Sequence, residues 1–282
     1  MGVPMASHLV AAGYDVRGYD VDPAARARFE EASGAEAAGS LAAAAAGARA
    51  VVLMLPDSSV VDAVVLEQGL LEAMEEGSLL IDMSSSEPTE TQRLAEVAAR
   101  HGVQLVDAPV SGGVRGAVAA TLAVMVGGTD EQAETCRPLL ETMGGKVMHV
   151  GPVGSGHALK ALNNLLSATT LLISSEAFLV GRRFGLDPQV MVDVINGSTG
   201  RSYSTEHKLP DFVLPESWTS GFGLRLMVKD MRTAVGLADA TGTPLRLGGL
   251  STELWERAAA ELPANADHTE IARWLAAELE GG

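Results

Sequence analysis

One lysine and one asparagine carry the sharpest chemical signal in this sequence. Lys160 and Asn164 lie four residues apart in a long run without proline that is rich in Leu, Ala, Ile and Thr. On a helix this spacing places both side chains on one face, so an ammonium and a carboxamide can converge on a single substrate oxygen. Apolar surroundings favour the neutral amine, which suits a general acid/base. The competing interpretation is a lysine whose stem packs on the core while its charge reaches solvent.

A glycine-rich turn after a predicted strand forms a second candidate site. Ser111, Gly112 and Gly113 follow the strand predicted at residues 103–106. Backbone N–H groups in such a turn can point at a carboxylate and form a small anion cradle. The alternative is a flexible loop, since glycines are common after strands.

The N-terminus is similar to part of a dinucleotide-binding unit. Residues 1–9 and 13–16 look like its first helix and second strand, and Gly2 would be the third glycine of G-x-G-x-x-G. The other two glycines and the first strand would lie upstream of Met1. Asp20, at the end of the predicted second strand, can accept hydrogen bonds from ribose hydroxyls, and no Lys or Arg follows at 21 or 22 to neutralise a 2′-phosphate. NAD is therefore favoured over NADP, unless Asp20 or the better-placed Asp22 merely caps the next helix.

The order of elements positions these residues. Strands are predicted at residues 50–55, 78–81 and 103–106, and helices begin at Pro23, after Ser40, at Pro88 and after Thr129, which forms a capping box with Gln132. This alternation predicts an α/β Rossmann-type, doubly wound domain over residues 1–152, with a parallel sheet that lacks its first strand.

After residue 152 the alternation stops. Apolar residues recur at helical spacing from Gly156 to Gly185, and further helices are predicted near residues 188–195, 222–240 and 250–260. Glycine and proline at residues 151–154 mark the change of pattern. We therefore expect an all-α domain over residues 153–282.

Composition narrows the class of protein. With 47% hydrophobic and 20% charged residues the chain is an ordinary globular protein, and its net charge of −16 argues against nucleic-acid or anionic-membrane partners. A single cysteine, Cys136, indicates a reducing compartment, which predicts a cytoplasmic location. We expect no membrane span and no signal peptide. The six histidines show no spacing with Asp, Glu or Cys that indicates a metal site.

Five motifs in order along the whole chain resemble those of the β-hydroxyacid dehydrogenases, the family of 3-hydroxyisobutyrate dehydrogenase. The motifs are Met54-Leu55-Pro56, Ile81-Asp82-Met83-Ser84-Ser85 with Pro88, residues 107–113 (DAPVSGG), Gly154-x-Gly156-x-x-x-Lys160-x-x-Asn163-Asn164, and Lys229-Asp230. As a set they are specific, because they occur in the family's order at family-like spacing.

The resemblance implies an oxidoreductase that transfers a hydride between the nicotinamide of NAD, with NADP less favoured, and a small 3-hydroxy acid or its semialdehyde. Lys160 would be the acid/base and Asn164 would orient the substrate. The implied binding residues are Ser111, Gly112 and Gly113 for the substrate carboxylate, Leu55 and Pro56 beside the nicotinamide, Ser85 in place of the family's threonine near the ribose, and Lys229 from the helical domain. The resemblance also implies a homodimer or homotetramer formed through the helical domain.

Two alternatives remain at this point. Imine reductases share the architecture but generally lack the lysine at position 160. A non-catalytic homologue is the other alternative: if the chain begins at Met1, the sheet lacks a central strand and the pyrophosphate turn. The intact downstream motifs favour an upstream start codon or a trimmed sequence instead.

Overall fold

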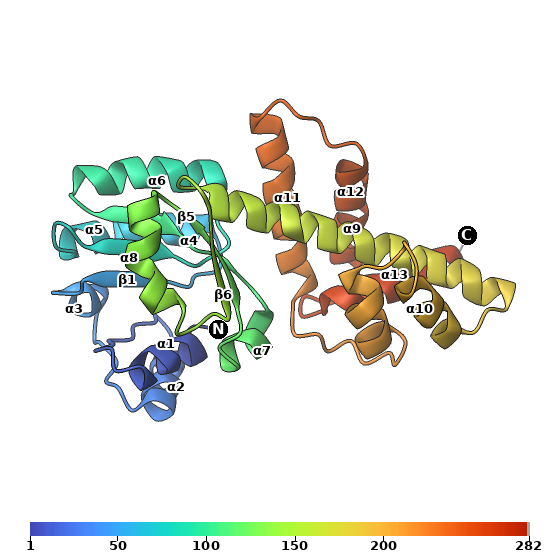
Figure 1. Cartoon of the computed structure of the whole chain (residues 1–282), viewed down its shortest axis with the longest axis horizontal. Coiled ribbons are helices and arrows are strands. Elements are labelled where there is room, and N and C mark those ends of the chain that lie inside the picture. The colour runs from blue at the N-terminus through green and yellow to red at the C-terminus, as the bar shows by residue number, and fades with distance from the viewer. Residues whose placement is uncertain (281–282) are drawn as a thin grey trace. The chain divides into compact units, whose positions relative to one another are not determined.

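The computed structural model describes residues 1–280. The chain divides into two compact units, Met1–Lys160 and Ala161–Gly282. The division falls within the first turns of the long helix α9 (Ser155–Phe184), which is labelled in Figure 1. The change of sequence pattern lies in the turn before that helix.

The first unit is built on a six-stranded mixed sheet. Strands β1 (Ala50–Leu53), β2 (Leu79–Asp82) and β3 (Gln104–Asp107) are parallel neighbours. Strand β5 (Ala123–Gly127) runs antiparallel to β3 and to β4 (Val110–Ser111), while β6 (Lys146–Gly151) runs parallel to β5. The prediction of a parallel sheet is right for β1 to β3 and wrong at β5.

The length of one connection explains the reversal at β5. A parallel crossover needs a dozen or more residues, but β4 and β5 are joined through the six-residue helix α7 (Gly113–Val118) and a short turn. The chain therefore folds back beside the strand it has just left. β3 and β4 form one path along β5, interrupted at Pro109, whose carbonyl accepts a 3.0 Å hydrogen bond from the Met125 N–H.

Helices in the first unit begin at the predicted residues. Asp22 accepts a hydrogen bond from Ala24 N, Ser40 accepts one from Ala43 N, and the Thr129–Gln132 capping box is complete. The helices are α1 (Gly2–Ala11), α2 (Pro23–Ser33), α3 (Leu41–Ala45), α4 (Ser58–Asp62) continued by a π-helical turn (Ala63–Glu67), α5 (Leu70–Ala73), α6 (Pro88–Arg100), α7 and α8 (Asp130–Leu140).

The expected second strand does not form. Residues 13–20 are mostly exposed, and within them only Gly18 makes an isolated bridge, to Ala37. A strand needs a neighbour for its backbone groups, and in the dinucleotide-binding pattern that neighbour is the first strand, which the sequence given does not include. The prediction of a strand ending at Asp20 is therefore wrong.

Side chains that alternate along β2 belong to two separate hydrophobic cores, one on each face of the sheet. Leu79 and Ile81 of β2 pack with Met5 of α1 and Leu140 of α8, whereas Leu80 packs on the opposite face with Leu94 of α6. This is the period-two alternation of a strand covered by helices on both faces.

The second unit is helical throughout the part that the structure describes. After α9 come α10 (Pro188–Asn196), a π-helical segment (Ser204–Val213), α11 (Leu224–Ala240), α12 (Leu247–Glu261), a 3₁₀ turn (His268–Glu270) and α13 (Ile271–Glu280). The core contains Leu171 of α9, Met231 of α11, Trp255 of α12 and Ile271 of α13. The sequence predicts no membrane span, but one described helix, α9, is long and apolar enough to cross a membrane by length and composition. Of that window, 44% is buried inside the structure.

Candidate active site

Loops at the carboxyl ends of β1 and β2 are joined by side-chain hydrogen bonds. The Leu55 N–H donates to Ser84 Oγ at 2.9 Å. The buried Asp82 carboxylate accepts from the Ser84 N–H and from Ser86 Oγ, both at 2.9 Å. The predicted cofactor residues Leu55, Pro56 and Ser85 therefore follow neighbouring strands at the same edge of the sheet, where open α/β sheets bind ligands.

The carboxylate of Asp107, at the end of β3, caps the start of α9. It is fully buried and accepts hydrogen bonds from the Gly154 N–H at 2.7 Å and the His157 N–H at 2.8 Å. Burial raises the pKa of Asp107, while the charge of His157 and these two N–H donors oppose that rise.

Glycines allow the close approach around Asp107. A Cβ atom on Gly156 would lie 2.3 Å from the Met125 carbonyl oxygen, and one on Gly127 would lie 2.2 Å from Asp107 Oδ1. The glycine of the Gly154-x-Gly156 motif that precedes Lys160 thus has a packing reason, independent of any ligand.

His157 is buried and hydrogen-bonded at both ring nitrogens. Nδ1 lies 2.8 Å from Thr91 Oγ1 of α6, and Nε2 lies 3.1 Å from the Ser84 carbonyl oxygen. A carbonyl can only accept, so Nε2 carries a proton. Two carboxylates also face the ring: Asp82 Oδ2 lies 3.9 Å from Nε2, and Asp107 Oδ2 lies 3.8 Å from Nδ1.

Lys160 and Asn164 lie one turn apart on α9, and both are buried, at 8% and 6% exposure. In the second unit Asn164 Nδ2 donates to Asp230 Oδ2 at 2.5 Å, and the Lys229 ammonium pairs with Asp230 Oδ1 at 3.1 Å. Asp230 of α11 therefore brings two predicted residues, Asn164 and Lys229, together.

Asp230 is a residue whose role the sequence reasoning missed. It was part of the Lys229-Asp230 motif but had no assigned function. The available signal was a carboxylate on the apolar face of α11, three residues after Met227 and four before Ala234, both buried. Asp107 and Thr91 were missed in the same way, because Gly154 and His157, to which they are hydrogen-bonded, are distant in sequence. Asp82 was also missed, although its partners Ser84 and Ser86 are close in sequence.

The glycine-rich turn has a backbone that requires glycine. Ser111 ends β4, and Gly112 and Gly113 have φ of 129° and 61°, in the region that L side chains rarely adopt. Their conformation alone therefore explains both glycines, and the anion cradle stays a prediction.

The N-terminal helix and Asp20 have features that fit a dinucleotide. Helix α1 begins at Gly2 with no side-chain cap and no acidic residue in its first turn, so its first N–H groups suit a phosphate. Asp22 caps α2, which leaves Asp20 exposed with one carboxylate oxygen bonded to the Asp22 N–H at 2.9 Å. The assignment of Asp20 to the cofactor ribose requires that Asp22, and not Asp20, caps helix α2, as the structure has it.

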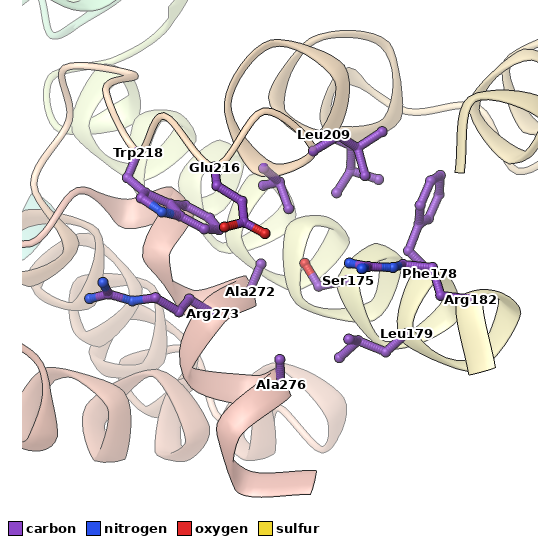
Figure 2. Close-up of a pocket in the computed structure, with 12 residues that line it drawn as sticks. Ser175, Phe178, Leu179, Arg182, Leu209, Glu216, Trp218, Ala272, Arg273 and Ala276 are labelled. Atoms are coloured by element: carbon purple, nitrogen blue, oxygen red, sulfur yellow. The ribbon is translucent and has the colours of Figure 1, made fainter. Parts of the chain in front are cut away.

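Two pockets in the second unit contain none of the predicted site residues. One, of about 150 Å³ in the second unit, is apolar, with Trp218, Phe178 and two arginines, Arg182 and Arg273, in its lining (Figure 2). The other, of about 220 Å³, lies between α11 and α12. Among residues 1–278, whose side chains the structure describes, no group of His, Cys, Asp and Glu could hold a metal ion.

Comparison with known proteins defines the class. Residues 1–151 match the sequence model of the NAD-binding domain of 6-phosphogluconate dehydrogenase, and residues 154–275 match that of the NAD-binding region of NADP-dependent 3-hydroxyisobutyrate dehydrogenase. The chain belongs to the β-hydroxyacid dehydrogenases, a family of NAD(P)-dependent oxidoreductases.

Particular relatives are similar over nearly the whole chain. The mouse mitochondrial 3-hydroxyisobutyrate dehydrogenase is 36% identical over 99% of this chain and 85% of its own length. The 2-(hydroxymethyl)glutarate dehydrogenase of Eubacterium barkeri is also 36% identical, over 91% of this chain and 85% of its own. The structure of Mycobacterium tuberculosis 3-hydroxyisobutyrate dehydrogenase with L-serine has a TM-score of 0.91 at 36% identity, covering 98% of this chain and 95% of that one.

Imine reductases share the fold alone. The enzyme from Myxococcus stipitatus, in complex with NAD⁺, has a TM-score of 0.65 at 17% identity. These comparisons confirm the predicted family, its two-domain fold class and the use of a nicotinamide cofactor.

Proposed function

We propose that this protein transfers a hydride between the nicotinamide of NAD and a small 3-hydroxy acid of the 3-hydroxyisobutyrate type, or the corresponding semialdehyde. The observation that carries the proposal is the buried Lys160, one helical turn before a buried Asn164 whose amide is fixed by Asp230. Relatives of similar length are named for such substrates.

The residues divide the chemistry between them. Bound nicotinamide supplies the hydride acceptor in oxidation and the donor in reduction. Lys160 takes the hydroxyl proton in oxidation and returns it in reduction. Asn164 uses one of its two N–H bonds on Asp230, which leaves the other for the substrate oxygen. Ser111, Gly112 and Gly113 bind the substrate carboxylate, and Leu55, Pro56, Ser85 and Lys229 contact the cofactor.

The test of the acid/base role is Lys160→Ala. The variant should lose turnover by at least about 10²-fold, the usual contribution of general acid/base catalysis, with nearly unchanged NADH affinity by nicotinamide fluorescence. A matched control is Lys146→Ala, because Lys146 is exposed at the start of β6. Full turnover by Lys160→Ala would refute the role, and absence of any NADH signal from the wild type at millimolar cofactor would refute catalysis by this chain.

We propose NAD rather than NADP as the preferred cofactor. The support is the exposed Asp20 carboxylate, which would repel a 2′-phosphate. Arg26 Nη1 already donates to the Asp20 carbonyl oxygen at 2.6 Å, so removal of the carboxylate leaves a cation at this position. Asp20→Ser should therefore raise the NADP-to-NAD ratio of kcat/KM by roughly 10-fold or more. An unchanged ratio would contradict the assignment of Asp20 to the ribose.

We propose that the chain pairs with a second copy through the helical unit. Leu166, Ile173 and Val180 of α9 are 67%, 56% and 68% exposed, and they repeat every seven residues. This spacing is that of a helix seam packed against another helix. Ile173→Glu should shift the mass measured by light scattering toward the monomer, and a wild type that is monomeric at micromolar concentration would refute the proposal.

We also propose a cytoplasmic location, because the single cysteine, Cys136, indicates a reducing compartment. Burial raises the pKa of the Cys136 thiol to about 11, so this cysteine is a core residue with little thiolate at neutral pH. Fractionation of the source cells with an antibody to the protein would test the location.

A further inference from the structure

Five buried polar side chains of the first unit have no part in the proposed chemistry. Asp82, Ser84, Thr91, Asp107 and His157 are each at most 3% exposed. Buried polar groups are costly unless they are hydrogen-bonded, and a satisfied network rigidifies the elements that it joins. Here those elements are the loop after β2, helix α6, the end of β3 and the start of α9.

His157 connects the cofactor-side loops to α9. Its Nε2 donates to the Ser84 carbonyl oxygen at 3.1 Å, and Ser84 Oγ accepts from the Leu55 N–H at 2.9 Å. The path therefore runs from the loop after β1, through the loop after β2, to the helix that carries Lys160. Lys160 follows His157 by three residues, a rise of roughly 4.5 Å along the helix.

The second ring nitrogen fixes the orientation of His157. In the neutral ring Nδ1 accepts from the Thr91 hydroxyl, 2.8 Å away. The same hydroxyl lies 3.0 Å from the Glu87 carbonyl oxygen, so its single proton is shared between two acceptors. The ring is thus held from α6 on one side and from the β2 loop on the other.

Asp107 fixes the axial position of the same helix turn. Its two carboxylate oxygens accept from the Gly154 and His157 N–H groups, at 2.7 and 2.8 Å. A carboxylate at a helix N-terminus also interacts favourably with the helix dipole. Movement of α9 along or about its axis would break one of these bonds.

We infer that His157, with Asp107, is a positioning residue that holds Lys160 in register with the loops after β1 and β2, where the proposed nicotinamide contacts lie. The inference rests on the proposed acid/base role of Lys160. Neither residue is assigned contact with substrate or cofactor, and both act through the placement of α9. Reactions that depend on a proton acceptor in register with a hydride acceptor are sensitive to small displacements, and a 1 Å misplacement costs about 10²-fold.

The test compares His157→Leu, which removes both ring bonds, with His157→Gln, which keeps an N–H donor for the Ser84 carbonyl. Leu140→Ala serves as the matched control, because it removes a fully buried side chain of α8 from a hydrophobic core of the same unit that includes no residue of α9. Steady-state kinetics with NAD and 3-hydroxyisobutyrate are measured well below each melting temperature. Hydrogen–deuterium exchange of amides 154–161 supplies a readout that needs no turnover.

We expect His157→Leu to lower kcat by about 10²-fold while KM for NAD changes less than about threefold. We expect exchange at amides 157–161 to be about tenfold faster than in the wild type. His157→Gln should recover kcat to within about tenfold of the wild type, and Leu140→Ala should lower the melting temperature with kcat unchanged.

Other outcomes overturn the inference. If His157→Leu keeps wild-type kcat or wild-type exchange at amides 157–161, His157 does not position the helix. A loss of kcat in Leu140→Ala equal to that in His157→Leu would assign the effect to general instability. Lys160→Ala is assayed in parallel: if it is inactive while His157→Leu is fully active, the proposed function stands and only the positioning role fails. If Lys160→Ala is fully active, both fail.

Discussion

Gly156→Ala should break the packing that holds the start of α9. The added Cβ would lie 2.3 Å from the Met125 carbonyl oxygen and 2.8 Å from Asp107 Oδ2. Van der Waals contact needs about 3.3 Å, so the helix start must move by roughly 1 Å away from rigid backbone. Overpacking of this kind destabilises a protein by about 1–3 kcal/mol, and a 1 Å shift of Lys160 would lower kcat by about 10²-fold.

The natural control for that variant is Gly236→Ala. Gly236 lies in α11 with no atom within 4 Å of the position of an added Cβ. Alanine in a helix interior is favoured over glycine by about 0.5–1 kcal/mol, so this variant should be slightly stabilised. Urea unfolding and kcat are measured for both. Equal stability of Gly156→Ala and the wild type, with equal kcat, would refute the close approach of α9 to β5 and Asp107.

Two further predictions concern stability. Burial, aided by the nearby Lys208 ammonium, lowers the pKa of His268 from 6.5 to about 4. The unfolded chain binds this proton more tightly, so the stability due to the neutral ring is present above pH 6.5 and is lost as pH falls, by about 2 kcal/mol between pH 7 and pH 5. His268→Gln should remove that part of the pH dependence of the unfolding free energy measured in urea, whereas the same substitution at the exposed His101 should not. A pH profile of His268→Gln identical to that of the wild type would contradict this role of His268. Thr129→Ala, which removes one half of the α8 capping box, should cost about 1 kcal/mol by the same assay, and no loss would show that the cap is replaced by solvent.

Local signals predicted the elements of this fold well. Strands β1, β2 and β3 are short apolar runs between helix caps, and each cap at Asp22, Ser40 and Thr129 is a contact between residues two or three positions apart. Such contacts depend on the immediate sequence alone, and the structure has them where the sequence indicated.

Features that depend on a distant partner could not be predicted in this way. The direction of β5 follows from the length of the connection through α7, and the failure of residues 13–20 to form a strand follows from the lack of a neighbouring strand in the sequence given. Neither property is encoded in the hydrophobic pattern of the segment itself.

The candidate site shows the same division between local and distant contacts. Helical spacing alone predicted that Lys160 and Asn164 lie on the same face of a helix, because residues four positions apart are neighbours on successive helical turns. Asp230, which fixes the Asn164 amide, lies 66 residues later, and only the folded chain joins the two. The pairing of Asn164 and Lys229 through a single carboxylate is therefore a finding of the structure.

The Gly154-x-Gly156 motif shows why a family motif need not report binding chemistry at each of its positions. Gly156 is required because Met125, Pro109 and Asp107 leave no room for a side chain, and Asp107 is buried because it caps the helix that begins there. The helix cap, the glycine and the lysine one turn further along thus form one structural unit. Selection for a correctly placed Lys160 would retain all three, although only the lysine is proposed to exchange a proton with substrate.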